Sequence, residues 1–418
     1  MNLLLVAYFY PPCADTGAHR PEAMAKWLRR LGHRVTVLTT SAYGRRNDED
    51  GVVRTPDLQR LRARLHGHER IDALFDSDTY SGRPHPLSKL LVPEPLVASW
   101  APFARSRALR LHRRDRFDCV ITSSPPESAH LVGRALARRG AGWVVDLRDA
   151  WTFETLRPPF PTALQRRLDR RLERRWLASA DVVVCVSRPA AEDLRLRLGI
   201  EPRMIPNGWD PELRELDDDP GATADILDPD RISLVYTGRF GSYGRDPAPL
   251  VEALAELARR DPGTAARLEL VVAGPLTEAE AELMRSDVGP ARIVVAGSLA
   301  RERALALQRA ADALLLVAQP RRSQLLNFKL FEYLAAERPI LALAAGTEAG
   351  RIAAEAGAAV APADDPGAIL KALRRLARDE LPPSDSSAAA EFAYPAPAER
   401  MAEAARSAIE AARARRHR

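Results

Sequence analysis

Short apolar runs alternate along this chain with stretches in which apolar residues recur at helical spacing. The runs predict buried strands, and the helical spacing predicts amphipathic helices. In the first half of the chain, the predicted strands cover residues 3–8, 34–38, 119–121, 143–145, 182–186 and 204–205. Helices are predicted between them, for example over 20–31 and 128–139. Apolar strands joined by helices are typical of a parallel sheet covered on both faces.

The same alternation restarts in the second half, after a polar, turn-prone stretch that suits an interdomain linker. Predicted strands there cover residues 233–236, 268–273, 293–296, 313–317 and 340–343, and an amphipathic helix is predicted over 399–415. Residues 40–115 show few clear strands, and we expect helices and loops there. The pattern predicts an α/β chain of two doubly wound, Rossmann-like domains with a cleft between them. Their predicted extents are 1–212 and 213–396, followed by a helix within 397–418 that packs back toward the first domain.

Length and composition agree with a soluble two-domain protein. A chain of 418 residues is too long for one compact core, and its 46% hydrophobic and 28% charged residues are ordinary for a globular protein. The net charge of +6 is too small to favour a nucleic acid as the main partner. The three cysteines are far apart and include no CxxC pair, so we expect neither disulfides nor a zinc site. The first residues resemble a strand more than a signal peptide, and no apolar run approaches the ~20 residues of a membrane span, so we expect a cytoplasmic protein.

Lysine is rare in this chain, and one lysine stands out. Arginine supplies all but four of the 62 basic residues, the exceptions being Lys26, Lys89, Lys329 and Lys371. A lysine ammonium binds phosphate as a compact point charge. Glu332 is predicted to share a helix face with Lys329, so the pair offers a cation for a diphosphate and a carboxylate for sugar hydroxyls. An ordinary surface ion pair is the alternative.

Two strand-end loops in the second half carry glycine and arginine. Gly238, Arg239 and Arg245 follow the strand at 233–236, and Gly274 follows the strand at 268–273. Glycine lets a diphosphate approach the backbone, and arginine binds its oxygens. In a chain so rich in arginine, each of these residues alone is weak evidence for a site.

The first half has charged residues at the end of a predicted strand. Asp146, Arg148, Asp149 and Trp151 follow the strand at 143–145, where charges suit a binding cleft better than a core. Gly17 lies in a turn of small residues that enters a helix, where backbone N–H groups can meet an anion or a sugar. The turn has no GxGxxG pattern and does not predict a dinucleotide site.

Residues 164–176 of the first half have an apolar residue at every fourth position, with arginines between these positions. We expect a helix packed on the core with a solvated basic face, and weak contact with an anionic bilayer surface is the alternative. The acidic run 217–219 lies in the predicted linker and is interpreted as solvated charge. No metal site is predicted.

In order and spacing, several of these motifs resemble glycosyltransferase family 4, whose members have the GT-B fold, and the resemblance covers essentially the whole chain. It is carried by residues 10–12 with Gly17, and by 32–39, 124–131, 146–151, 180–182, 205–210 and 328–336.

The resemblance implies a retaining, metal-independent transferase. The co-substrate would be a nucleotide-diphosphate sugar, with a uridine diphosphate sugar as first choice, and no cofactor would be needed. The first domain would hold the hydroxyl acceptor, which would be a saccharide, a lipid-linked sugar or a small molecule in cell-envelope polysaccharide, glycolipid or natural-product synthesis. The second domain would hold the donor.

Site residues follow from the matching motifs together with the strand-end loops. Those predicted to bind the donor are Gly17, Asn207, Gly238, Arg239, Arg245, Gly274, Lys329, Leu330 and Glu332. Those predicted to bind the acceptor are Asp146, Arg148, Asp149 and Trp151. The predicted catalytic residues are Arg239, Lys329 and Asp149.

The chain departs from the family pattern at two positions. Gln324 stands where the first of two donor-site glutamates is expected, and Gly244 stands where a lysine is expected, next to Arg245. These departures keep one alternative open, a non-catalytic protein that binds a nucleotide sugar. The fold keeps a second one open, because it also supports sugar-nucleotide 2-epimerases.

Overall fold

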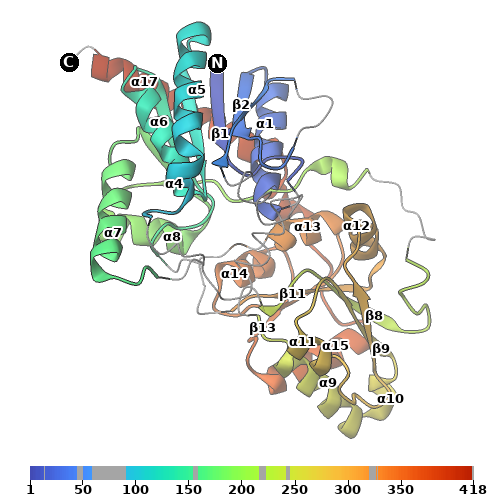
Figure 1. Cartoon of the computed structure of the whole chain (residues 1–418). Coiled ribbons are helices and arrows are strands. Elements are labelled where there is room, and N and C mark those ends of the chain that lie inside the picture. Colours follow the sequence, from blue (N-terminus) through green and yellow to red (C-terminus); the bar gives the residue numbers. More distant parts are fainter. Residues whose placement is uncertain are drawn as a thin grey trace. The chain divides into compact units, whose positions relative to one another are not determined.

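The chain consists of two compact units. Unit 1 contains Met1–Asn207 and Tyr394–Arg418, and unit 2 contains Gly208–Ala393. The computed structural model describes residues 1–13, 15–44, 50–58, 91–153, 159–215, 223–241, 245–319, 326 and 328–416 (Figure 1). Gln324, Gly244 and the acidic run 217–219, all interpreted above, lie outside the described residues.

Unit 1 is built on a parallel sheet of the doubly wound type. Its strand order is β3-β2-β1-β4-β5-β6-β7, and every pairing is parallel. The strands are β1 Asn2–Ala7, β2 Arg34–Thr40, β3 Val52–Thr55, β4 Cys119–Ser124, β5 Gly142–Leu147, β6 Val182–Cys185 and β7 Arg203–Met204. Strand β3 lies in the segment where few strands were expected. The order reverses between β1 and β4, and in sheets of this type ligands bind at the carboxyl ends of the strands beside such a reversal.

Helices pack on both faces of this sheet. They are α1 His19–Arg30, α4 Leu96–Ser99, α5 Ala101–Asp115, α6 His130–Ala137, α7 Ala163–Leu177, α8 Arg188–Asp193 and α17 Ala396–Arg416. Trp100, Trp143 and Trp151 are fully buried in the core on one face. His130 is buried beside them, and its Nδ1 lies 2.8 Å from the Thr122 hydroxyl. Burial lowers the pKa of His130 to about 3, so its imidazole is neutral.

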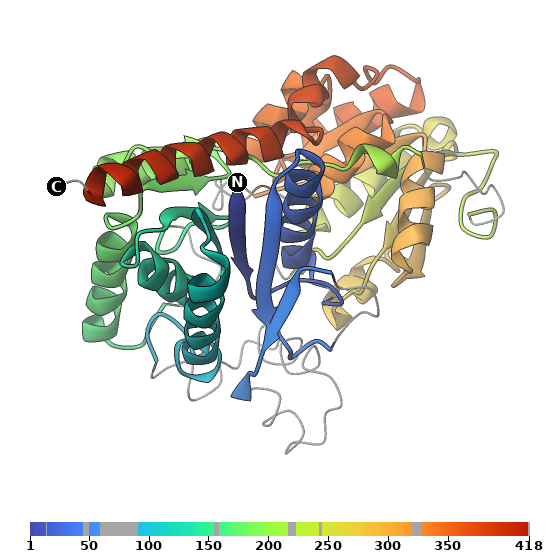
Figure 2. The same ribbon diagram turned by 90° about the horizontal axis from the view of Figure 1, so that it is seen from above.

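The last helix, α17, completes unit 1. It packs across β5, β4 and β6 and against α1, and Figure 2 shows it as a long rod over this sheet. A Cβ atom on Gly142 would lie 2.7 Å from the backbone of Ala408, so only glycine allows this close approach. Met401, Ala404 and Ala408 share a core with Leu3 and other strand residues.

Helix α7 is oriented differently from our expectation. Its buried face carries Asp169 and Glu173, while Leu164 and Leu168 are 77% and 44% exposed. The acids are buried because they are paired: Asp169 accepts from the Trp151 indole at 2.9 Å, and Glu173 accepts from Thr152 and Arg197. The second half of the helix packs its apolar residues inward: Trp176 and Leu177 are buried, and Leu172 is partly buried against the same core.

Unit 2 is a second doubly wound unit. Its strand order is β10-β9-β8-β11-β12-β13, again parallel, with the reversal between β8 and β11. The strands are β8 Ile232–Thr237, β9 Leu268–Ala273, β10 Arg292–Gly297, β11 Ala313–Val317, β12 Ile340–Leu343 and β13 Ala359–Ala361. The helices are α9 Ala248–Arg260, α10 Pro262–Ala265, α11 Glu278–Leu283, α12 Arg301–Ala310, α13 Phe328–Ala336, α14 Glu348–Glu355, α15 Pro366–Ala377 and α16 Ser386–Ala389.

The prediction of two Rossmann-like α/β sheets is confirmed. No helix of the described ranges is both long enough and apolar enough to cross a membrane. Cys13, Cys119 and Cys185 are all buried.

Candidate functional site

The strand ends of unit 2 carry two glycine turns in close contact. Gly238, directly after β8, has a φ of +141° and donates its N–H to the Ala273 carbonyl at 2.8 Å. A Cβ atom on Gly274, directly after β9, would lie 1.9 Å from the Gly238 carbonyl oxygen. No side chain fits at that point, so the two turns meet backbone to backbone. They form a floor of backbone at the carboxyl ends of β8 and β9, and β8 also borders the switch toward β11.

Lys329 and Glu332 meet above this floor, on the first turns of α13. The Lys329 ammonium donates to Glu332 Oε2 at 2.7 Å, and a Cβ atom on Gly238 would lie 3.9 Å from Lys329 Cε. Glu332 is only 2% exposed, and it also accepts from Arg301 at 3.1 Å and Gln308 at 3.3 Å. The pair is therefore not an ordinary surface ion pair, because its carboxylate is buried inside a network.

Tyr333 anchors this network to the sheet. Its hydroxyl accepts the Thr237 N–H at 3.0 Å, and the Thr237 side chain accepts from Gln308 at 2.9 Å. Burial raises the pKa of Tyr333 well above its usual value, so this hydroxyl stays protonated. The last residue of β8 is thus tied to α12 and α13, and this fixes the position of Glu332.

Two side chains fix the backbone of the loop after β8 by hydrogen bonds to one carbonyl. The Tyr236 hydroxyl donates to the Arg239 carbonyl at 2.7 Å, and Arg245 donates to the same carbonyl at 2.9 Å. Tyr236 also stacks on Phe240, with ring centroids 4.0 Å apart. Arg245 therefore positions the backbone of Arg239.

The electrostatic field at this corner is positive. A helix N-terminus carries a partial positive charge, and Lys329 adds a full charge in the first turn of α13. Lys329 and Arg301, at the start of α12, carry two positive charges against the one negative charge of Glu332, so these three side chains keep a net charge of +1. The corner can therefore accept an anion against the glycine floor.

In unit 1, Asp146 at the end of β5 is the centre of a buried network. Arg20 donates to it with two nitrogens, at 2.8 and 3.2 Å, and Ser123 donates to it at 2.9 Å. Burial alone would raise the pKa of Asp146, but the charge and hydrogen bonds of Arg20 outweigh burial and lower it. Asp146 is thus an ionised structural carboxylate. Arg20 also binds the Pro206 carbonyl at 2.7 Å, next to Asn207.

Arg148 ties three strand-end loops together. It donates to the carbonyls of Gly17, Pro125 and Ser124, the last at 3.2 Å. Its neighbour Asp149 is only partly exposed, and burial raises the pKa of this carboxyl. A carboxylate with a raised pKa is a better proton acceptor, which gives this loop a candidate base.

Two predicted site residues lie in the core. Trp151 is 1% exposed, with its indole bound to Asp169, and it supports the loop from behind rather than lining a surface. Leu330 is fully buried on the inner face of α13. The other predicted residues form two groups. Gly238, Arg239, Arg245, Gly274, Lys329 and Glu332 lie in unit 2, and Gly17, Asp146, Arg148, Asp149 and Asn207 lie in unit 1.

Sequence reasoning missed Arg20, Arg301 and Gln308. Arg301 is the first residue of a helix that directly follows a strand-end turn. Site residues are common at such positions, so its place in the sequence could have indicated a role in the site. The abundance of arginine hid that signal. Within the described ranges, no group of three or more His, Cys, Asp or Glu side chains is arranged to hold a metal ion.

Solved structures of other proteins match nearly the whole chain in fold. Sucrose-phosphate synthase from Thermosynechococcus elongatus matches at 17% identity with a TM-score of 0.67, covering 98% of this chain and 99% of that chain. A glycosyltransferase from Rickettsia africae matches at 13% identity with a TM-score of 0.62, covering 98% of each chain. Anabaena HepE in complex with UDP matches at 16% identity with a TM-score of 0.59, covering 96% of this chain and 98% of that chain. At these identities the likeness establishes the GT-B fold.

Comparison with curated protein sequences finds no match. Family models, in contrast, match both halves of the chain. Residues 16–208 match the glycosyl transferase 4-like domain, and residues 231–379 match the glycosyl transferases group 1 domain. The chain therefore belongs to the family 4-like glycosyltransferases of the GT-B fold.

Proposed function

We propose that this glycosyltransferase is a retaining, metal-independent enzyme that transfers a sugar from a nucleotide-diphosphate sugar to a hydroxyl acceptor. The observation that carries the proposal is the pairing of Lys329 with a buried Glu332 directly above the Gly238 turn. A diphosphate needs a cation and close access to the backbone, and a ribose needs a fixed carboxylate. This corner of unit 2 offers all three.

In the proposed donor complex, the diphosphate lies on the turns of Gly238 and Gly274, and Lys329 and Arg239 contact its oxygens. When Lys329 turns from Glu332 to the diphosphate, Oε2 of Glu332 is released to accept hydrogen bonds from the ribose hydroxyls, while Arg301 and Gln308 keep its carboxylate in place. As the glycosidic bond breaks, negative charge develops on the departing phosphate oxygen. The ammonium of Lys329 and the N-terminus of α13 stabilise this charge in the role that a metal ion has in other transferases.

For the acceptor we propose the strand-end loops of unit 1. Asp149 is partly buried with a raised pKa, which suits a group that accepts the proton of an incoming hydroxyl. Arg148 keeps the loops of Gly17 and Ser124 in place around it. Asp146 acts indirectly, since it is saturated by Arg20 and Ser123.

A uridine diphosphate sugar is the first donor to test. The support is the structural likeness to Anabaena HepE, which is in complex with UDP. The acceptor is proposed as a saccharide, a lipid-linked sugar or a small molecule in the synthesis of polysaccharide, glycolipid or natural product.

Helix α7 supports a weak peripheral contact with an anionic membrane. Leu164 and Leu168 are exposed on its first half, and Arg167, Arg170 and Arg171 are exposed beside them. Leucines flanked by arginines match the apolar boundary and the phosphates of an anionic bilayer. In this proposal, Leu164→Glu combined with Leu168→Glu abolishes sedimentation with anionic vesicles. Unchanged sedimentation would remove α7 from the proposal.

The function itself is tested by incubating the protein with UDP-sugars and candidate acceptors, with and without a chelator. Nucleotide release that requires an acceptor, persists in the chelator and gives a product of unchanged anomeric configuration is the expected result. A changed UDP-sugar formed without acceptor would indicate a 2-epimerase. Donor binding in calorimetry without turnover on any acceptor would indicate a non-catalytic binding protein.

A further inference from the structure

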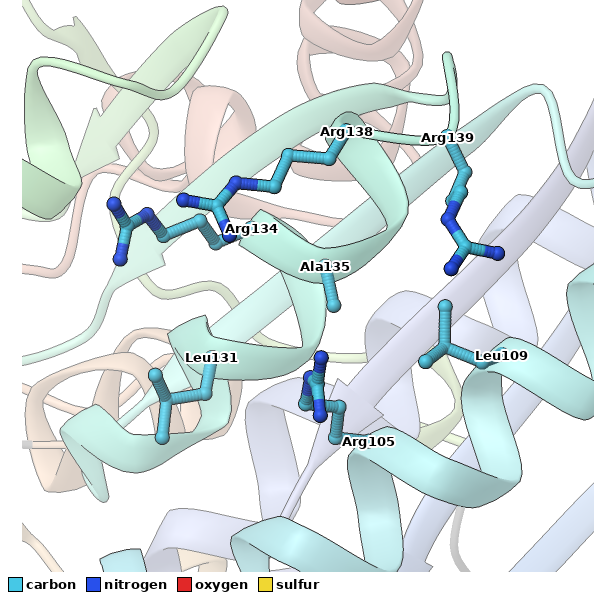
Figure 3. Close-up of a pocket in the computed structure, with 7 residues that line it drawn as sticks. All are labelled: Arg105, Leu109, Leu131, Arg134, Ala135, Arg138 and Arg139. Atoms are coloured by element: carbon cyan, nitrogen blue, oxygen red, sulfur yellow. The ribbon is translucent and has the colours of Figure 1, made fainter.

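A hollow of about 210 Å³ lies between α5 and α6 of unit 1. Its lining combines four arginines with three apolar side chains, namely Arg105, Arg134, Arg138, Arg139, Leu109, Leu131 and Ala135. Figure 3 shows Arg134 of α6 and Arg138, the residue after this helix, projecting to the same side, with Arg105 rising from α5 toward Ala135. None of these residues belongs to the strand-end loops. The hollow is therefore separate from the site of the proposed transfer reaction.

These four arginines have no carboxylate partner among the residues that the structure describes. Other arginines of unit 1 do form ion pairs with carboxylates: Arg197, for example, binds both Glu173 and Asp193. Burial, together with the positive charges of Arg138 and Arg175, lowers the pKa of Arg134. The like charges of Arg134 and Arg138 repel each other, and an anion bound between them would offset that repulsion.

The chemistry of the lining indicates which anion fits. A guanidinium group offers planar pairs of N–H donors that match the oxygens of a phosphate, and several such groups can surround one phosphate. Leu109, Leu131 and Ala135 supply an apolar wall, which limits water on one side and strengthens the charge interaction. A hollow of this size admits a small anionic group rather than a whole nucleotide sugar.

We propose that the hollow between α5 and α6 is a binding site for a phosphate group. The phosphate is either the headgroup of an anionic lipid or part of a soluble phosphate ester. This inference does not depend on the proposed transfer reaction, and it is tested without measuring activity.

The test compares two double variants of the full chain with equal loss of charge. Arg134→Gln with Arg138→Gln alters the hollow, and Arg110→Gln with Arg113→Gln removes two exposed arginines of α5 that lie outside its lining. Binding of inorganic phosphate and pyrophosphate is measured by calorimetry at low ionic strength. Sedimentation is measured with phosphatidylglycerol vesicles and with phosphatidylcholine vesicles.

The expected result is at least a tenfold loss of affinity in the Arg134/Arg138 variant and less than a twofold loss in the control variant. If this difference appears with soluble phosphates, the ligand is a phosphate ester. If it appears only with phosphatidylglycerol vesicles, the ligand is a lipid headgroup. Equal losses in both variants, or no binding by the wild type to either probe, would overturn the proposal.

A third variant keeps the test valid if the double variant fails to fold. Ala135→Glu adds a carboxylate to the lining of the hollow without removing any arginine, so it should lower the affinity for phosphate at least tenfold. Thermal melting and circular dichroism report folding for every variant. A folded Ala135→Glu protein that binds both probes like the wild type would contradict the proposal.

Discussion

Replacing Lys329 with methionine removes the ammonium but keeps a flexible side chain of similar length. In the proposed mechanism, the lost charge no longer stabilises the departing phosphate oxygen. Loss of one such stabilising group typically costs about 10²–10³-fold in rate, or about 2.7–4 kcal/mol. We therefore expect kcat/KM for the UDP-sugar to fall by about this factor, with kcat accounting for most of the fall.

The cost of Lys329→Met to folding should be smaller, for a reason visible in the network. The Lys329 side chain is 23% exposed and its ammonium donates a hydrogen bond to Glu332, which keeps its bonds to Arg301 and Gln308. Loss of one hydrogen bond to a charged group lowers the free energy of unfolding by about 1.5–3 kcal/mol. The variant should therefore stay folded at assay temperature while losing most of its activity.

Two further variants make the experiment specific. Lys371→Met removes an exposed lysine on α15 and should leave both rate and stability unchanged. Lys329→Arg keeps the charge but replaces a compact ammonium with a planar fork, so part of the activity should return. The assay is the initial rate of acceptor-dependent UDP release, with donor affinity measured by calorimetry. Turnover of Lys329→Met within twofold of the wild type would refute the assigned role.

Three other perturbations test the structure. Gly274→Ala forces its Cβ against the Gly238 carbonyl, so we expect about 1–3 kcal/mol of destabilisation in urea melts together with weaker donor binding; an unchanged melt would contradict this packing. Because the pKa of His130 is lowered to about 3 in the fold, its contribution to stability is complete above pH ~6.5 and declines by up to about 1.4 kcal/mol per unit as the pH falls. Urea denaturation of His130→Gln at pH 7 and pH 5 should show a shallower pH dependence than the wild type, and an equal dependence would argue against this origin. Arg20→Met leaves the buried Asp146 without its cation and should cost about 3–5 kcal/mol, whereas adding Asp146→Leu should recover most of the loss; no recovery would mean that the two residues do not act as a pair.

The sheets could be predicted from the sequence because parallel strands buried on both faces leave continuous apolar runs. The stretch 182–186 contains β6, and 268–273 coincides with β9. Short or solvent-exposed strands leave weaker signals, which is why β3 and β13 were missed. The pairing of Lys329 with Glu332 was also predictable, since helical spacing alone places them on one face.

Other features depended on tertiary partners that spacing does not reveal. The apolar repeat of α7 predicted a buried leucine face, but the bonds of Asp169 to Trp151 and of Glu173 to Arg197 turn these acids inward. Leu164 and Leu168 are therefore exposed. Trp151 looked like a pocket residue because it follows charged residues, whereas its indole is bound in the core. Gln308 reaches Glu332 from a different helix, and no local pattern connects the two.

The placement of α17 has a consequence for how the protein is made. Unit 1 consists of a first segment, Met1–Asn207, and a last segment, Tyr394–Arg418, with the whole of unit 2 encoded between them. Until that last segment leaves the ribosome, the face of the sheet around Leu3 and Gly142 lacks the helix that covers it. All of unit 2 is synthesised before α17, so unit 2 can finish folding while unit 1 still lacks this helix. Unit 1 is thus the first unit to begin synthesis and the last to complete its fold.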